Sequence, residues 1–142
     1  MSVRATGKYN VKTWEEKPCH EVDGLPRLTR ASAIEEFEGD IEGEGTAEYV
    51  MAYRDDGSAS YVRVERVIGR IGSRSGSFVL QGTGSYDHNT RTAECTWFVV
   101  PGTGTGELRG LRGAGGFVAK HSEYPNVPIT LDYSFEELPL GA

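Results

Sequence analysis

The sequence predicts an all-β domain of eight antiparallel strands, arranged as an up-and-down barrel or as a sandwich. Three observations support this prediction. Hydrophobic residues recur at every second position along much of the chain, which is the period of a strand. Glycine makes up 19 of 142 residues, roughly twice the usual ~7%, and interior glycine disfavours helices by about 1 kcal/mol per site. Turn-forming sequences such as residues 55–58 (DDGS) separate the alternating segments.

The first half of the chain is expected to contain four strands. Residues 8–14 are rich in β-branched and aromatic side chains, and residues 28–41 alternate moderately, with nearby glycines that disfavour a helix. Residues 46–53 alternate clearly, with one face formed by Ala47, Tyr49, Met51 and Tyr53. After the turn at residues 55–58, a fourth strand is expected to return over residues 61–68.

Four further strands are expected in the second half, over residues 77–81, 92–100, 115–119 and 128–136. A short helical turn is expected over residues 107–111. Several strands carry large side chains on both faces, which favours a single eight-stranded antiparallel up-and-down β-barrel with its outer face covered. We expect one domain over residues 1–142, with its core over about residues 7–137. Barrels of this size can hold one small ligand.

Charge and cysteine content restrict the classes of partner. The net charge is −6 and the pI about 5.1, so nucleic acid is a poor partner because binding it needs a basic surface. No apolar run approaches the ~18 residues of a membrane span, and the N-terminal residues lack the apolar core of a signal peptide. Cys19 and Cys95 do not make a disulfide framework. These features predict a cytoplasmic protein with no membrane association.

The motifs of cofactor and metal sites are absent. The glycine-rich run over residues 102–110 fails the G-x-G-x-x-G pattern, since the sixth positions are Glu107 and Arg109, and it lacks the Lys-Ser/Thr of a P-loop. The three histidines, His20, His88 and His121, show no zinc-ligand spacing. We therefore expect no cofactor and no metal.

Charged residues within the alternating strands are the candidate catalytic groups. Arg66 lies on the same face as Val62 and Val64, so if that face is internal, Arg66 is a buried cation that needs a carboxylate partner. Glu48 and Glu65 are the candidates on the paired strands, and Glu65 and Arg66 must face opposite ways. A buried carboxylate with a raised pKa could act as an acid or base. The alternative is a salt bridge at the barrel mouth or between subunits.

Large aromatic side chains are the candidate substrate-binding residues. Rings with a polar tip suit a ligand pocket, although packing in the core is the alternative role. These residues are Trp14, Tyr49, Tyr53, Trp97 and Tyr133.

Three segments together resemble the bacterial DUF3224 family. They are residues 39–49 (GDIEGEGTAEY), 69–81 (GRIGSRSGSFVLQ) and 97–113 (WFVVPGTGTGELRGLRG), and the resemblance extends from about residue 7 to residue 136. It implies a fold like that of allene oxide cyclase, an eight-stranded antiparallel β-barrel. Related barrels include cofactor-free cyclases and dirigent proteins, but fold alone does not carry their activity over.

The sequence leaves three functions open. The first is a small-molecule-binding barrel that acts as a cofactor-free isomerase or cyclase on a small apolar, polyketide-like or terpenoid-like substrate. The second is a lipocalin-like binding or carrier barrel without catalysis, and the third is a structural barrel with a filled core. An open cavity of a few hundred Å³ would separate the first two from the third. We also expect a homo-oligomer, because two-sided aromatic strands need cover for their outer rows.

Overall fold

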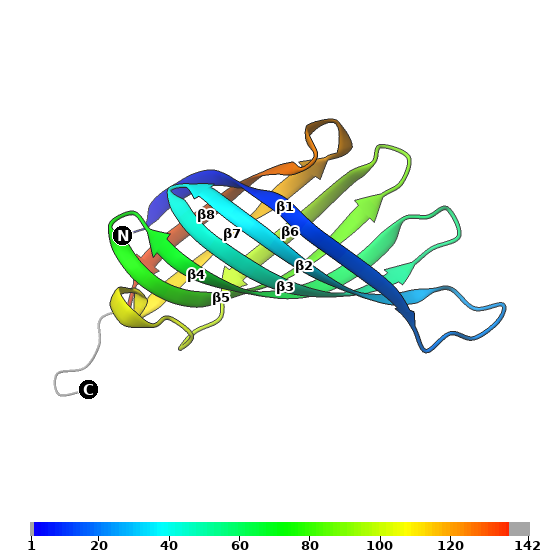
Figure 1. Cartoon of the computed structure of the whole chain (residues 1–142), viewed down its shortest axis with the longest axis horizontal. Coiled ribbons are helices and arrows are strands. Elements are labelled where there is room, and N and C mark those ends of the chain that lie inside the picture. Colours follow the sequence, from blue (N-terminus) through cyan, green and yellow to red (C-terminus); the bar gives the residue numbers. More distant parts are fainter. Residues whose placement is uncertain (1, 137–142) are drawn as a thin grey trace.

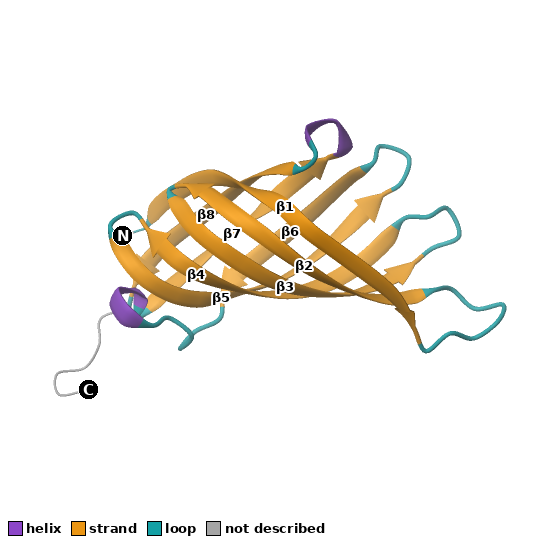
Figure 2. Ribbon diagram, viewed as in Figure 1, coloured by secondary structure: helices purple, strands orange, loops and turns teal. Residues whose placement is uncertain are grey.

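Eight antiparallel strands close into a barrel in which each strand pairs with the next and the last pairs with the first (Figures 1 and 2). The structure is a computed structural model and describes residues 2–136. The strands are β1 (Val3–Cys19), β2 (Leu28–Gly39), β3 (Ile41–Tyr53), β4 (Ala59–Ile71), β5 (Arg74–Asp87), β6 (Thr92–Val99), β7 (Leu111–Lys120) and β8 (Asn126–Phe135). Two 3-10 turns, η1 (Gly106–Leu108) and η2 (His121–Glu123), complete the fold. The predicted all-β barrel of eight strands is confirmed.

Most strands extend beyond the predicted segments. The predicted strand over residues 77–81, for example, is the middle of β5, which pairs with β4 from Arg74 to Tyr86. The strands continue past the end of the alternating pattern because their backbones remain hydrogen-bonded to the neighbouring strand there. The expected helical turn over residues 107–111 is wrong in its bounds, since η1 ends at Leu108 and β7 begins at Leu111. Glu137, at the end of the expected core, lies outside the described residues.

A β-bulge in β1 sets the direction of the side chains near one end of the barrel. Val11 pairs with Glu35 and Thr13 pairs with Ile34, so Lys12 has no partner on β2. The extra residue shifts the alternation of β1 by one position. Trp14, which pairs with the buried Ala33, therefore lies on the inner face.

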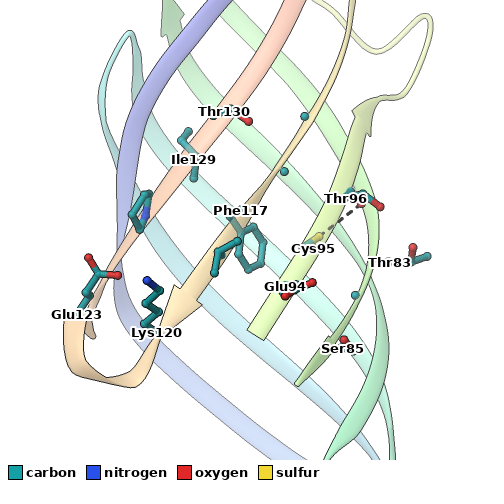
Figure 3. A pocket seen from close by; sticks show the side chains of 15 residues that line it. Thr83, Ser85, Glu94, Cys95, Thr96, Phe117, Lys120, Glu123, Ile129 and Thr130 are labelled. Atoms are coloured by element: carbon teal, nitrogen blue, oxygen red, sulfur yellow. Dashed lines mark hydrogen bonds between the residues drawn. The ribbon is translucent and has the colours of Figure 1, made fainter. Parts of the chain in front are cut away.

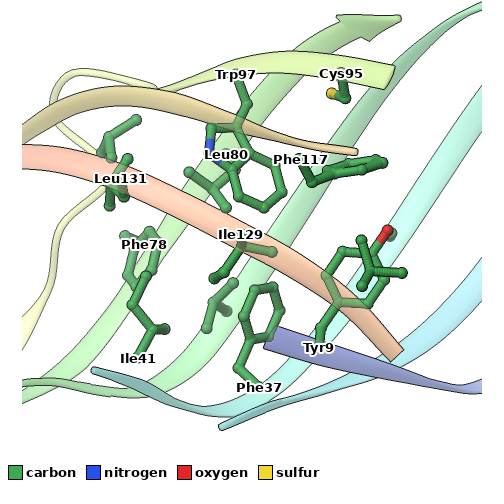
Figure 4. Close-up of a cluster of buried hydrophobic side chains, with 14 of the residues drawn as sticks. Tyr9, Phe37, Ile41, Phe78, Leu80, Cys95, Trp97, Phe117, Ile129 and Leu131 are labelled. Carbon is green, nitrogen blue, oxygen red and sulfur yellow. The ribbon is translucent and has the colours of Figure 1, made fainter. Parts of the chain in front are cut away.

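The two ends of the barrel differ. Apolar side chains fill the interior at the end that carries the N-terminus and η1 (Figure 4). They include Phe37, Ile41, Phe78, Leu80, Leu108 and Leu131, each at most 2% exposed. At the opposite end lie the turns over residues 20–27, 54–58 and 88–91, together with η2, and the β1–β2 hairpin projects farthest (Figure 1).

Glycines inside the strands make room for large inward-facing side chains. A Cβ atom on Gly84 of β5 would lie 2.6 Å from the hydroxyl oxygen of Tyr61. Because Gly84 has no side chain, the Tyr61 ring can lie against β5 and donate a hydrogen bond to the carbonyl oxygen of Glu94 at 2.7 Å. Part of the high glycine content therefore shapes the interior of the barrel.

The outer face of β4 is unusually apolar for a solvent-exposed surface. Val62, Val64 and Ile68 are 51%, 49% and 62% exposed, and Val50 on β3 pairs with Val62. The expected homo-oligomer stays a prediction. Among residues 2–136, no helix is long and apolar enough to cross a membrane.

Candidate functional site

A cavity of about 360 Å³ occupies the interior at the end opposite the N-terminus. Its size is at the lower end of the range for small-molecule sites. The wall is rich in aromatic side chains, and Trp14 and Tyr49 lie with their ring centres 5.0 Å apart. The aromatic residues that line it are Tyr9, Trp14, Tyr49, Tyr53, Tyr61, Tyr86, Phe117 and Tyr124.

A buried network of charged side chains lies at the inner end of this cavity. Nη2 of Arg63 on β4 donates to Oε1 of Glu35 on β2 at 3.0 Å and to Oε1 of Glu65 at 2.6 Å. The hydroxyl of Tyr49 on β3 donates to Oε2 of Glu35 at 3.2 Å. Glu35 lines the cavity, whereas Arg63 and Glu65 lie deeper along β4. The three charged side chains are at most 1% exposed.

Aromatic rings enclose the Arg63 guanidinium. Its carbon lies 4.9 Å from the ring centre of Tyr49, 5.4 Å from that of Trp97 and 5.2 Å from that of Phe117. Such rings attract a cation through their quadrupoles, and the attraction is stronger where water is absent. The rings and the two carboxylates together compensate the burial of this cation.

The network leaves several polar atoms unsatisfied within the described residues. Nε and Nη1 of Arg63 and Oε2 of Glu65 have no hydrogen-bond partner there. Gly45 on β3 makes the space for this carboxylate, since a Cβ at Gly45 would lie 2.3 Å from Oε2 of Glu65. Buried polar atoms without partners are uncommon in folded proteins. The interior therefore retains donors and an acceptor beyond those its own contacts use.

Burial and charge shift the pKa of two members of the network, Glu65 and Arg63. Loss of solvent raises the pKa of Glu65 well above its ordinary value, Arg63 opposes this rise, and the charge of Glu35 adds to it. Burial acts against the charge of Arg63, but the attraction of Glu65 and its other neighbours outweighs it and raises the Arg63 pKa. At the mouth, burial and the bond to Glu16 raise the pKa of Tyr53 to about 12. Glu65 therefore keeps its proton to a higher pH than an exposed glutamate does.

The predicted catalytic residues do not lie together. Glu65 is inside the barrel, while Glu48 and Arg66 are exposed on the outer face. The face of β4 that carries Val62 and Val64 is external, so the interior cation is Arg63. Strand alternation cannot tell which face is internal. The pairing of Tyr49 with Arg63 across the β3–β4 hairpin is the sequence signal that could have indicated Arg63.

The predicted substrate-binding residues divide between the cavity and the core. Trp14, Tyr49 and Tyr53 line the cavity. Trp97 is buried, and its indole N–H donates to the carbonyl oxygen of Thr130 at 3.0 Å. Tyr133 packs edge-on against Phe135, with ring centres 6.1 Å apart, at the filled end. Glu35, Tyr9 and Tyr61 also line the cavity, although the sequence pattern did not indicate them as site residues.

A larger groove of about 800 Å³ crosses the region of β5 to β8 (Figure 3). Many of its lining residues, such as Thr83, Glu94 and Thr96, are exposed on the outer surface. Gly116 on β7 contributes no side chain to this surface, which deepens the groove. No charged side chain in it is buried, so the interior cavity is the better candidate site. Within residues 2–136, no group of three or more His, Cys, Asp or Glu side chains could hold a metal ion.

Fold and cavity together define a closed β-barrel with one filled end, one open aromatic end and a buried ion-pair network between them. The chain belongs to the DUF3224 family, because the model of this family matches residues 5–133. The members of this family are described as proteins of unknown function. The chain is similar to a crystal structure of a DUF3224 protein of unknown function from Shewanella oneidensis MR-1. The two are 29% identical with a TM-score of 0.76, over 96% of this chain and 100% of that chain. A comparison with curated proteins finds no match.

Proposed function

We propose that the protein binds a small molecule in the cavity at the open end of the barrel. The observation that carries the proposal is the composition of the wall, in which aromatic side chains surround one buried carboxylate, Glu35. Ligand sites are commonly concave and apolar, with a few polar groups that fix orientation. A barrel built only for stability would gain more from filling this space with apolar side chains, as the opposite end does.

The wall indicates the chemistry of the ligand. Stacked and edge-on contacts with tyrosine and tryptophan rings favour a ring-containing, largely apolar molecule. Oε2 of Glu35 already accepts a hydrogen bond from Tyr49, and its remaining lone pair can accept another from a ligand hydroxyl. We therefore expect an aromatic or alicyclic ligand, and a hydroxyl on its ring system could approach Glu35 and Tyr49.

Blocking the cavity tests this proposal. Ala119 lines the cavity, so Ala119→Phe would occupy the space of the ligand. Ala114 is exposed on the outside of the same strand, so Ala114→Phe is the matched control. With naphthalen-2-ylmethanol as the probe, isothermal titration calorimetry should show binding to wild type and to A114F. Binding to A119F should be weaker by about tenfold or more, because the ring contacts are lost.

Thermal unfolding of both variants shows whether the barrel remains folded. Equal affinity for wild type and a folded A119F would place the probe elsewhere and overturn the proposed site. Absence of binding to wild type would count against a cavity that accepts ring-containing molecules.

A cofactor-free isomerase or cyclase is the second candidate function. The observation that favours it is the fixed position of the Glu35 carboxylate, which Arg63 and Tyr49 hold at the cavity wall. A carboxylate held in this way could remove a proton from a bound substrate. Here Glu35, rather than Glu48 or Arg66, is the proposed base, because those two residues lie on the outer face.

A simple proton-transfer reaction separates this candidate from a binding or carrier barrel. With 5-nitro-1,2-benzisoxazole, Glu35 would take the proton from carbon 3 while the N–O bond breaks, and 2-cyano-4-nitrophenolate is released. We expect wild type and Glu48→Gln to accelerate this reaction, and Glu35→Gln to lose roughly 100-fold in rate, as general bases typically contribute. Absorbance of the nitrophenolate measures the rate. Equal rates for wild type and E35Q would contradict proton transfer by Glu35 and favour a barrel that binds a ligand without catalysis.

A further inference from the structure

Three basic residues form an arc on one side of the cavity mouth. Arg91 ends the β5–β6 turn, Lys120 ends β7, and His121 begins η2. The backbone N–H of His121 donates to the carbonyl oxygen of Arg91 at 3.0 Å, and Thr92 pairs with Lys120. All three residues border the cavity, and Lys120 also borders the outer groove. We call these three residues the basic arc.

The basic arc has no counter-ion among the described residues. Within residues 2–136, no ion pair involves Arg91, Lys120 or His121. Glu123 follows in η2 near Lys120 (Figure 3) but makes no ion pair with it. This local positive charge occurs in a chain whose net charge is −6.

The glutamate that borders the cavity mouth already accepts hydrogen bonds from neighbouring side chains. Glu16 on β1 accepts hydrogen bonds from the indole N–H of Trp14 at 3.2 Å, from the hydroxyl of Thr29 at 2.7 Å and from the hydroxyl of Tyr53. These bonds fix Glu16 on the β1 side of the mouth, whereas the basic arc lies on the side of β6 to β8. On one side of the mouth, therefore, the carboxylate of Glu16 is hydrogen-bonded. On the other side, the basic arc has no counter-ion among the described residues.

Arg91 occupies a backbone conformation that an arginine seldom adopts. Its φ angle is +52°, in the left-handed region where glycine and asparagine are most common. Glycine would meet the requirement of the turn more easily, but it would remove a long cationic side chain from the cavity mouth. The position thus combines a strained backbone with a cationic residue that borders the cavity.

We propose that the basic arc binds the anionic head of the ligand, and that the ligand is an organic acid with an apolar, ring-containing body. The inference rests on the proposed function and deepens it. The guanidinium of Arg91 can hold a carboxylate through two parallel hydrogen bonds, and Lys120 adds a second cation. The body of the acid then extends from the mouth along the aromatic wall towards Glu35.

A matched pair of probes tests the head group separately from the cavity. The probes are 2-naphthoate, which carries the carboxylate, and neutral naphthalen-2-ylmethanol. We expect wild type to bind 2-naphthoate at least about tenfold more tightly than the alcohol by isothermal titration calorimetry. Raising NaCl from about 0.05 to about 0.5 M should reduce this preference, because salt screens exposed charges.

The double variant Arg91→Gln/Lys120→Gln should bind the two probes equally while its affinity for the alcohol is unchanged. Lys12→Gln is the matched control, because Lys12 lies on the outer face in a pair with Glu36. Equal affinity of wild type for acid and alcohol would overturn the head-group inference and leave the proposed cavity standing. Parallel loss of both probes in the double variant would also overturn it, since the arc would then only support the mouth. Binding of neither probe to wild type would overturn the proposed function itself.

Discussion

Replacing Arg63 with methionine should lower the free energy of unfolding by about 3–5 kcal/mol. The substitution keeps most of the side-chain volume but leaves Glu35 and Glu65 buried without their shared cation. Breaking one member of a buried ion pair is more costly than replacing the whole pair, because an uncompensated charge stays in the interior. Urea unfolding at neutral pH measures the effect.

Two variants make this prediction specific. Arg66→Met changes the same residue type on the outer face of the same strand and should leave the unfolding midpoint unchanged within error. The triple variant Arg63→Met/Glu35→Gln/Glu65→Gln removes the cation and both carboxyl groups and should regain most of the lost stability. The penalty of R63M should also shrink at low pH, where Glu65, whose pKa burial raises, is protonated. If R63M were no less stable than R66M, the network would not need its cation.

The contribution of Glu65 to stability should decrease as the pH rises. The pKa of Glu65 in the folded protein is raised well above the ordinary value of 4.5. Between pH 4.5 and this raised pKa, the folded state therefore binds more protons than the unfolded state. Its stabilising contribution is fully present below the unfolded pKa and is lost as the pH rises through the folded pKa. Within that window the loss reaches about 1.4 kcal/mol per pH unit for one proton.

Glu65→Gln should remove this dependence, because glutamine does not titrate. The measurement is the difference in unfolding free energy between wild type and E65Q from pH 4 upward, which cancels the titration of groups elsewhere. Glu48→Gln is the control, since Glu48 is exposed on the neighbouring strand and its loss should leave the wild-type slope in place. A wild-type curve parallel to that of E65Q at every pH would show that Glu65 titrates in the fold as it does in the unfolded chain.

The buried charged network lies between the open half and the filled half of the barrel interior. On β4, Tyr61 lines the cavity, Arg63 and Glu65 follow it inward, and Val67 belongs to the apolar core. The charged layer thus separates the open aromatic half from the filled half. Glu35 is the charged member of this layer that lines the cavity.

Local patterns were sufficient to predict most of the fold. The period of two and the turn at residues 55–58 predicted the β3–β4 hairpin, because alternation and tight turns depend on neighbouring residues alone. The bulge at Lys12 was not predictable in this way, since it appears only in the pairing of β1 with β2. It places Trp14 on the inner face, whereas simple alternation through Val11 would direct it outward.

The candidate site was predicted less completely, and the charged residues show why. Strand alternation alone predicts that Glu65 and Arg66 face opposite ways, and the cost of burying a charge predicts that an interior cation needs a carboxylate. Only barrel closure decided that the face with Tyr49, Arg63 and Glu65 is internal, and only the β2–β3–β4 ladders brought Glu35 to Arg63. Strand alternation is a local property of the chain. Which face loses contact with water depends on how all eight strands close around it.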